Sequence, residues 1–295
     1  MRPVSVVAGL ALAVVAAGCG SSAGESSAAG KIAVVTSTNV WGSVAQAVGG
    51  DAVAVTALIN DGSGDPHAYQ DKPRDATRLA AAELTVYNGG GYDDFFVKLA
   101  DAAGGQAKRI VAVDLAGNRP NEHVWYDFAS VRKVADKIAE ELGVVAPDRK
   151  DAFAGNARAF DAKLDELAGK AAKIGIDHPG AKVVCTEPVP QYLLETAGLI
   201  NATPDEFSQA IEEETDPPAA AVAEIDKLVT GKEAAAVINN AQTETPVTNA
   251  LKGLANKTGV PVVDVTETLP EGVTSYVDWM TSQIDALAGA LAEKP

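Results

Sequence analysis

The sequence predicts an α/β protein of two lobes, each a mostly parallel sheet with helices on both faces, joined by one long rigid helix. Three observations carry this prediction. Short β-branched runs alternate with helical stretches from Lys31 onward, and the same alternation returns after residue 180. Between the two sets lies a single apolar stripe with helical spacing. Alternating strands and helices are typical of parallel sheets, because each crossover helix covers a face of the sheet.

The first lobe is expected over residues 31–142. Apolar and β-branched runs mark its strands, and longer stretches with helical spacing mark its helices. The expected strands are 32–35, 53–58, 84–87 and 110–113, and the expected helices are 40–48, 75–82 and 95–103. Asn88-Gly89-Gly90-Gly91 follows the third strand. This segment lacks the GxGxxG order of a nucleotide-binding loop, so we interpret it as a tight turn from strand to helix.

A linker over residues 143–176 contains the long helix that joins the lobes. Its apolar residues are spaced alternately by four and three positions: Phe153, Ala157, Phe160, Leu164, Leu167, Ala171 and Ile174. This spacing places them on one face of a helix over 151–174, about 36 Å long. Because a helix that bridges two lobes resists bending, we expect small lobe movements. The alternative, a coiled-coil partner helix, is disfavoured because the stripe covers only about three heptads.

The second lobe is expected over residues 177–295, where the alternation of strands and helices returns. The expected strands are 183–186, 236–238 and 262–265, and the expected helices are 192–196, 219–228, 247–255 and 276–291. The two halves share this pattern without an internal repeat at the level of residues.

The N-terminus has the features of an export signal. Arg2 precedes an apolar run over residues 4–17, and Gly18-Cys19 follows. This order predicts a secretory signal peptide over residues 1–18, and the cysteine after small residues resembles the lipidation site of a lipoprotein. The alternative is an ordinary cleaved signal. Residues 19–30 are rich in Gly and Ser, as in flexible tethers. We expect an extracytoplasmic protein anchored to the cell membrane through a lipid on Cys19.

Composition excludes some partners. The chain has 24 Lys and Arg against 40 Asp and Glu, a net charge of −16, so a basic patch for nucleic acid is not expected. An acidic surface raises the local concentration of cations and also keeps an exported protein in solution. With Cys19 lipidated, Cys185 has no cysteine left to pair with, so the core must be stable without a disulfide. We expect a monomer.

Two of the three histidines lie in short, distinctive segments, Asp65-Pro66-His67 and His123-Val124-Trp125. Neutral imidazole is the commonest metal ligand and suits divalent first-row metals. His67 lies after the second expected strand and His123 after the fourth. Ligands of open α/β sheets bind outside the carboxyl ends of the strands, so both histidines are candidates for a metal site in the cleft between the lobes.

The second lobe supplies two carboxylates from equivalent loops. Glu187 directly follows the strand 183–186, and Glu267 closely follows the strand 262–265. Opposite the two imidazoles, they would complete a closed metal site of four residues: His67, His123, Glu187 and Glu267. Asp264 and Asp278 compete with Glu267 for the fourth place.

Over nearly its whole mature length, the chain resembles the solute-binding lipoproteins of manganese, zinc and iron ABC importers. Asp65-Pro66-His67-Ala68-Tyr69 resembles the Asp-Pro-His motif that carries the family's first ligand. His123-Val124-Trp125-Tyr126-Asp127 resembles the His-x-Trp-x-Asp motif that carries the second. Glu187 falls where zinc members have histidine and manganese members often have glutamate. Glu267 falls where the family usually has an aspartate, its fourth ligand.

The chain departs from the family pattern at three places. Glu267 is one methylene longer than the usual aspartate, so its carboxylate can approach differently or chelate in a bidentate manner. Gln70 stands where an acid is common. Between Asp114 and His123 the acidic, histidine-rich loop of many zinc members is missing.

Other polar residues are interpreted as structural. Cys185 is expected to be a small buried hydrophobe rather than a thiolate ligand. His178, before Pro179-Gly180, is expected in an exposed loop. Glu212-Glu213-Glu214 is expected to be a solvated run, with a place at the edge of the cleft as the alternative.

The resemblance implies a protein that captures a divalent cation and delivers it to an ABC permease, without enzymatic activity. Two imidazoles with two carboxylates suit Mn²⁺ and Fe²⁺, whereas three histidines would indicate Zn²⁺. We expect Mn²⁺, with Zn²⁺ a close second because the Irving–Williams order favours it, and Fe²⁺ third. A metal-dependent hydrolase is the first alternative, disfavoured by the missing HExxH. A binder of a metal chelate is the second, disfavoured by a chain that is only 5% aromatic.

Overall fold

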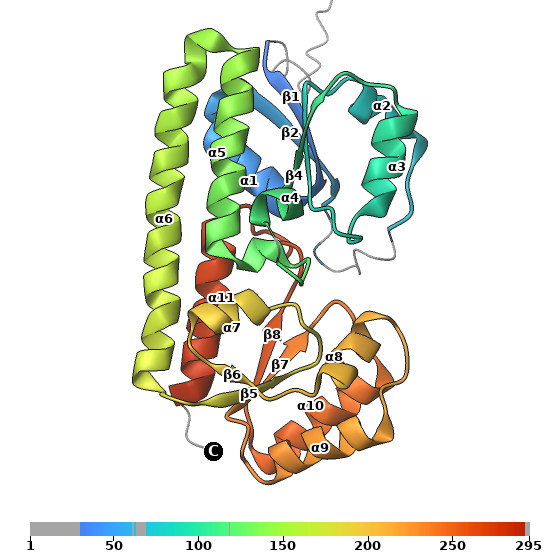
Figure 1. Ribbon diagram of the computed structural model, residues 1–295, viewed down its shortest axis with the longest axis vertical. Coiled ribbons are helices and arrows are strands. Elements are labelled where there is room, and N and C mark those ends of the chain that lie inside the picture. Colours follow the sequence, from blue (N-terminus) through green and yellow to red (C-terminus); the bar gives the residue numbers. More distant parts are fainter. Residues whose placement is uncertain (1–29, 61, 63–68, 118, 293–295) are drawn as a thin grey trace, which may run out of the picture. The chain divides into compact units, whose positions relative to one another are not determined.

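Two parallel sheets of four strands each organise the chain (Figure 1). The computed structural model describes residues 30–60, 62, 69–117 and 119–292. The strand orders are β2-β1-β3-β4 and β6-β5-β7-β8, and all of these pairings are parallel. Each sheet therefore places its own strands in the same order, second, first, third, fourth. The predicted α/β fold of two lobes joined by a long helix is confirmed.

The first lobe contains the sheet β2-β1-β3-β4. Its elements are β1 (Ile32–Thr38), α1 (Asn39–Gly49), η1 (Gly50–Ala52), β2 (Val53–Ile59), α2 (Pro73–Ala80), β3 (Leu84–Tyr87), α3 (Asp94–Ala102), β4 (Lys108–Val111), α4 (Ala112–Ala116) and η3 (Val124–Tyr126). The predicted strand 110–113 is wrong at its end, because Ala112 and Val113 begin α4. A short apolar run does not distinguish a strand from a buried helical segment.

Helices cover both faces of the first sheet because successive residues of a strand point to opposite faces. Val34 of β1 is buried in the core that includes α1 and α5, whereas its neighbour Val35 packs in a separate cluster with Leu79 of α2 and Phe96 of α3. Strands β2 and β3 pair in parallel with β1, and β4 pairs in parallel with β3, so the C-terminal ends of all four strands lie at one edge of the sheet. The loops that follow those ends carry the polar residues described below.

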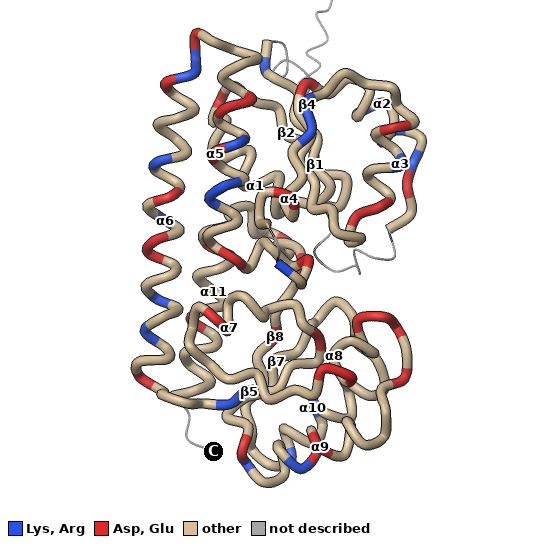
Figure 2. Tube along the Cα trace, viewed as in Figure 1, with Lys and Arg blue, Asp and Glu red and all other residues tan. Residues whose placement is uncertain are grey.

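The lobes are joined by the long helix α6 (Lys150–Asp177), which follows α5 (Phe128–Val145) of the first lobe and η4 (Pro147–Arg149). The 28 residues of α6 span about 42 Å. Its buried residues are the seven of the predicted apolar stripe, and it packs against α1 and α5 and also against α11 of the second lobe. Along its outer face, acidic and basic residues are interspersed (Figure 2), with ion pairs such as Lys163–Glu166 and Lys173–Asp177. The apolar stripe is thus buried against other helices of the same chain and is not left exposed for a partner helix.

The second lobe contains the sheet β6-β5-β7-β8. Its elements are β5 (Lys182–Cys185), α7 (Gln191–Thr196), β6 (Ile200–Asn201), α8 (Asp205–Glu212), α9 (Ala219–Thr230), β7 (Ala236–Asn240), α10 (Pro246–Thr258), β8 (Val262–Val265) and α11 (Tyr276–Ala292). The sequence pattern missed β6 and α8. The two residues of β6 are exposed, and α8 buries only Phe207, Ser208 and Ile211, so neither has a strong apolar pattern.

One hydrophobic core continues from lobe to lobe. Trp125 and Tyr126 of η3 belong to the same buried cluster as Tyr276 and Trp279 of α11. The Tyr276 hydroxyl donates to the Trp125 carbonyl at 2.7 Å, and the Tyr126 hydroxyl lies 2.7 Å from the Thr266 carbonyl oxygen. These buried contacts join the two lobes beside the connecting helix α6. Within the described ranges, no helix is both long enough and apolar enough to cross a membrane.

Candidate metal-binding site

Two buried carboxylates meet at the C-terminal edge of the second sheet. Glu187 follows β5 and Glu267 follows β8, and their exposed fractions are 2% and 1%. Asn240, the last residue of β7, lies between them. Its Nδ2 atom is 2.5 Å from Glu187 Oε2 and 2.7 Å from Glu267 Oε1. The hydroxyl of Thr243 also donates to the Glu187 carboxylate. The Asn240 amide thus links the two carboxylates, and the Thr243 hydroxyl is a second donor to Glu187.

The loops that carry these carboxylates are bonded to each other. Gln242, after β7, accepts from the backbone N–H groups of Glu267 at 2.6 Å and Thr268 at 3.2 Å. Its Nε2 atom donates to Thr268 Oγ1 at 2.8 Å. Since the strands β5, β7 and β8 are neighbours in one parallel sheet, their ends bring these three loops to one place. The carboxylates are therefore oriented by the backbone as well as by Asn240.

On the first-lobe side the imidazole of His123 is fully buried and oriented by Asn121. Asn121 Oδ1 lies 2.6 Å from His123 Nδ1 and accepts from the His123 backbone N–H at 2.8 Å, while Asn121 Nδ2 donates to the Pro188 carbonyl at 2.8 Å. Because the amide oxygen can only accept, Nδ1 must donate, and a neutral ring then carries its lone pair on Nε2. This is the tautomer that binds a metal through Nε2.

Tyr92 brings a first-lobe hydroxyl to the second-lobe carboxylates. The side chain is 4% exposed and its ring stacks obliquely on Trp125, with centroids 4.7 Å apart. Burial raises the pKa of Tyr92 well above its usual value, and the Glu267 carboxylate, hydrogen-bonded to the hydroxyl, raises this pKa further. The hydroxyl therefore stays protonated next to the Glu267 carboxylate.

The glycine segment before Tyr92 forms the tight turn that the sequence predicts between β3 and α3. Gly89 has a φ of +78°, and a Cβ there would lie 2.5 Å from the Val111 side chain, so glycine is required on both counts. The buried carboxylate of Asp93 accepts from the backbone N–H groups of Asn88 at 2.6 Å and Gly89 at 2.7 Å. Burial raises the pKa of Asp93, and these hydrogen bonds oppose that rise. The turn thus aims Tyr92 into the site.

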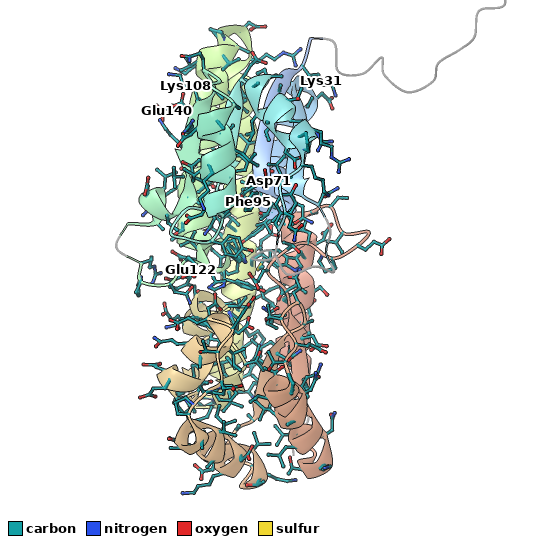
Figure 3. All side chains as sticks on the ribbon, turned by 90° about the vertical axis from the view of Figure 1, so that its right-hand side faces the viewer. Lys31, Asp71, Phe95, Lys108, Glu122 and Glu140 are labelled. Carbon is teal, nitrogen blue, oxygen red and sulfur yellow. The ribbon has the colours of Figure 1, made fainter. Side chains whose placement is uncertain are left out.

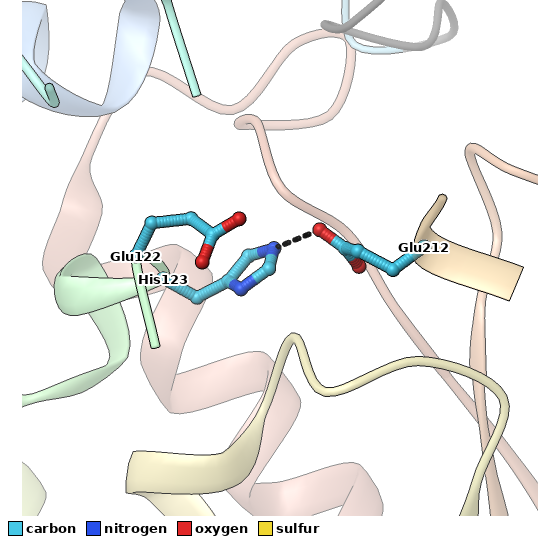
Figure 4. A group of neighbouring side chains, drawn as sticks. All are labelled: Glu122, His123 and Glu212. Atoms are coloured by element: carbon cyan, nitrogen blue, oxygen red, sulfur yellow. Dashed lines mark ion pairs between the residues drawn. The ribbon is translucent and has the colours of Figure 1, made fainter. Parts of the chain in front are cut away.

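The site contains a third carboxylate, that of Glu212, which lies next to the His123 imidazole. Glu212 Oε1, at the end of α8, is 3.5 Å from His123 Nε2, and the Glu212 side chain is 15% exposed (Figure 4). Ligand atoms of Glu122, His123 and Glu212 all lie within 4.8 Å of one another. Glu187 and Glu267 are not part of this group. Glu122 lies on the face of the molecule that also carries Phe95 and Asp71 (Figure 3).

The sequence interpretation of Glu212-Glu213-Glu214 needs correction at its first residue. Glu213 and Glu214 are exposed, as expected for a solvated run, whereas Glu212 faces His123 and takes the alternative place at the edge of the cleft. The helical spacing of the sequence indicates that Glu212 lies on the inner face of α8. Ser208, four residues earlier, is buried beside Phe207 and Ile211, so position 212 continues the inner face of α8.

An open groove lies beside the first-lobe part of the site. It has a volume of about 590 Å³ and is lined by residues that include Tyr69, Asp71, Tyr92, Phe95 and Lys98. Tyr92 belongs both to this groove and to the carboxylate cluster, so the groove reaches the site from the side of α3.

Some residues singled out in the sequence have no part in this geometry. Asp264 and Asp278 are exposed, which leaves Glu267 as the buried acid of its segment. Cys185 is 1% exposed and belongs to the core, and burial raises the pKa of its thiol to about 12. His178, expected in an exposed loop, is partly buried after the end of α6. His67 and Cys19 lie outside the described residues.

The described site is rich in negative charge. Glu187 and Glu267 contribute buried carboxylates, Glu212 and Glu122 contribute partly buried ones, and His123 contributes an imidazole whose Nε2 lies next to Glu212. A cation of opposite charge stabilises carboxylates that are buried or gathered around a buried imidazole. Imidazole nitrogen together with carboxylate oxygen forms a donor set for divalent first-row metals. Two α/β lobes joined by a long helix, with such a donor set at the strand ends, define a solute-binding protein for a metal cation.

Comparison with known proteins establishes the family. Residues 34–290 match the family model described as "ZnuA: Zinc-uptake complex component A periplasmic", and the chain belongs to this family. The protein is accordingly a metal-binding, substrate-binding component of an ABC importer rather than an enzyme, and a membrane permease is its implied partner.

The chain is similar to several characterised proteins. It is 25% identical to the metal ABC transporter substrate-binding lipoprotein FimA of Streptococcus parasanguinis, over 99% of this chain and 100% of that one. It is 28% identical to the manganese-binding lipoprotein MntA of Bacillus subtilis over 51% of this chain and 52% of that one. Among solved structures, the periplasmic zinc-binding protein TroA from Treponema pallidum superposes with a TM-score of 0.75 at 20% identity, covering 90% of this chain and 100% of that one, which shows a shared fold.

Proposed function

We propose that this protein captures Mn²⁺ outside the cytoplasm and delivers it to its ABC permease, with Zn²⁺ as the nearest competitor and Fe²⁺ third. The observation that carries the proposal is the pair of buried carboxylates, Glu187 and Glu267, held together by the single amide of Asn240. Two buried anions at this separation repel each other unless a cation lies against them. Capture of a divalent ion relieves that repulsion.

The proposed ligands are His67, His123, Glu187 and Glu267. The tautomer that Asn121 imposes on His123 supports its part, and burial at adjacent strand ends supports the two glutamates. His67 is assigned from its Asp65-Pro66-His67 motif. A set with two or more carboxylates and no cysteine favours Mn²⁺ and Fe²⁺ over softer ions. The name of the B. subtilis relative, a manganese-binding lipoprotein, points in the same direction.

We also propose that the protein is held at the outer face of the cell membrane by a lipid on Cys19. The motif Gly18-Cys19 at the end of an apolar run supports this, and so do the relatives named as lipoproteins. Such an anchor keeps the captured ion near the permease, while residues 19–30 act as a tether.

Metal titration of histidine variants tests the proposal. The full chain is purified in detergent under metal-free conditions and titrated calorimetrically with Mn²⁺ and with Zn²⁺. His67→Ala and His123→Ala should each lose more than about tenfold in affinity for both ions, because a ligand is worth at least as much as the groups that orient it. His178→Ala is the matched control and should bind as the wild type does. Wild-type affinity in His123→Ala would overturn the assignment of the site.

A further inference from the structure

We propose that Glu212 is a further ligand of the captured cation, and that its carboxylate biases the site towards Mn²⁺ over Zn²⁺. This inference rests on the proposed function, because it concerns the coordination of the same ion. Neither the sequence motifs nor the four proposed ligands include this residue.

The position of Glu212 is fixed by the core of the second lobe. Phe207 and Ile211 of α8 are 1% and 4% exposed and pack in the hydrophobic cluster on the outer face of that sheet. The end of the helix is closed by backbone bonds from Glu213 to Gln209 at 2.9 Å and from Thr215 to Ala210 at 2.7 Å. Glu212 therefore extends from a rigid helix end rather than from a solvated loop.

The distance to His123 suits two ligands of one ion. Glu212 Oε1 lies 3.5 Å from His123 Nε2 (Figure 4). Two donor atoms bound at about 2.1–2.2 Å to one ion are about 3.0–3.6 Å apart between octahedral and tetrahedral geometry, so the separation allows either coordination. The separation also exceeds that of a good hydrogen bond between nitrogen and oxygen. The carboxylate oxygen thus stands where a neighbouring ligand of the ion held by His123 would stand.

The hydrogen bond from His123 to Asn121 adds an independent reason. Since Nδ1 donates to Asn121 Oδ1, the Nε2 of a neutral imidazole presents a lone pair towards Glu212. A cation placed between this nitrogen and the carboxylate can bind both of them. Asn121 thereby prepares His123 and Glu212 for one positive ion.

The helix end makes the charge of Glu212 unfavourable without a cation. Glu212, Glu213 and Glu214 follow one another at the C-terminal end of α8, where acidic residues gather in Figure 2. The helix dipole places partial negative charge at this end and favours cations there. The Glu122 carboxylate, within 4.8 Å, adds to the negative field from the first lobe. A divalent ion beside His123 would offset the charges of the two carboxylates next to it, Glu212 and Glu122.

A further carboxylate affects the choice of metal through coordination number. Zn²⁺ prefers four ligands in tetrahedral geometry, whereas Mn²⁺ accepts six ligands that are rich in oxygen. With His67, His123, Glu187 and Glu267 in place, Glu212 would be the fifth residue to bind the ion. The gain from this oxygen is therefore larger for Mn²⁺ than for Zn²⁺.

Charge-neutralising variants of two adjacent residues test the inference. Glu212→Gln removes the proposed ligand, and Glu213→Gln makes the same change at the exposed neighbour on the same helix end. The full chain in detergent is titrated with Mn²⁺ and Zn²⁺, and the number of atoms that bind Mn²⁺ is measured by X-ray absorption. Glu212→Gln should weaken Mn²⁺ binding about tenfold or more, weaken Zn²⁺ binding by a smaller factor, and lower the Mn²⁺ coordination number. Glu213→Gln should change none of these.

Two results would overturn the inference. Equal affinity losses in Glu212→Gln and Glu213→Gln would show a general effect of charge, and an unchanged Mn²⁺ coordination number in Glu212→Gln would show a charge-paired contact without ligation. Both outcomes leave the proposed function standing, because it rests on the loss of affinity in His67→Ala and His123→Ala. If the wild type binds neither ion, or His123→Ala binds as the wild type does, the proposed function fails first and the inference fails with it.

Discussion

Each half of the site contains an asparagine whose side-chain amide orients a proposed metal ligand, and the two asparagines do so with opposite ends of the amide. In the first lobe, Asn121 presents its oxygen to His123 and so directs a neutral nitrogen donor. In the second lobe, Asn240 presents its nitrogen to Glu187 and Glu267 and so holds two anions together. The first half has an aromatic environment of Tyr92 and Trp125, whereas the second half consists of acidic and amide side chains at strand ends.

This difference separates two requirements of cation capture. The second half supplies carboxylate oxygens, which Asn240 holds next to each other. The first half supplies direction, because a single lone pair on Nε2 of His123 has one orientation set by Asn121. Variants of the two asparagines should therefore have different consequences.

The largest effect is expected from Asn240→Ala. This change removes the donor that both buried carboxylates share, so their repulsion grows and their positions loosen. Metal affinity should fall about tenfold to a hundredfold, and the metal-free protein should lose about 1–3 kcal/mol of unfolding free energy. Calorimetric titration and urea unfolding measure the two quantities.

Asn239→Ala is the matched control for that change. Asn239 precedes Asn240 on β7, is buried, and donates to the exposed Asp264 at 2.8 Å instead of to the site. It should lose stability without losing metal affinity. If both variants keep wild-type affinity, metal binding by Glu187 and Glu267 does not depend on Asn240. The proposed difference between the two halves of the site would then be wrong.

A smaller effect is expected in the first half, where two substitutions of Asn121 separate orientation from contact between lobes. Asn121→Ala removes the acceptor for His123 Nδ1 and the donor to the Pro188 carbonyl, and should lower affinity about tenfold. Asn121→Asp keeps the acceptor and loses the donor, so its affinity should stay near that of the wild type. Equal losses in a competition titration would assign the effect to the lobe contact rather than to the imidazole.

No effect on metal affinity is expected from Cys185→Ala, although this residue lies two positions before Glu187. Burial raises the pKa of the thiol from 9.0 to about 12. The unfolded chain therefore loses this proton first, and the stability contributed by the protonated thiol is present below pH 9 and lost as the pH rises towards 12. Cys185→Ala should lack that part of the alkaline destabilisation in urea unfolding. A lower Zn²⁺ affinity in this variant would instead reveal a sulfur donor and contradict the oxygen-rich second half.

Several elements could be predicted from local pattern. The alternating spacing from Phe153 to Ile174 predicted the buried face of α6, because helix geometry relates position in the chain to direction in space. The strand 84–87 was predicted with its correct bounds, and the glycine turn after it was interpreted correctly. By contrast, the end of β4 was wrong, since an apolar run such as 110–113 suits a strand or a buried helix equally well.

The sequence by itself determined the periodic faces, the two lobes, and which histidines and glutamates follow strand ends, because these depend on residues close together in the chain. Only the tertiary structure decided that Asn240 stands between Glu187 and Glu267, that Asn121 directs His123, and that Glu212 rather than Glu213 faces the imidazole. These contacts join residues far apart in the sequence, and their geometry depends on how strands and helices pack. A side chain gains a chemical role from its neighbours in space, which local spacing does not contain.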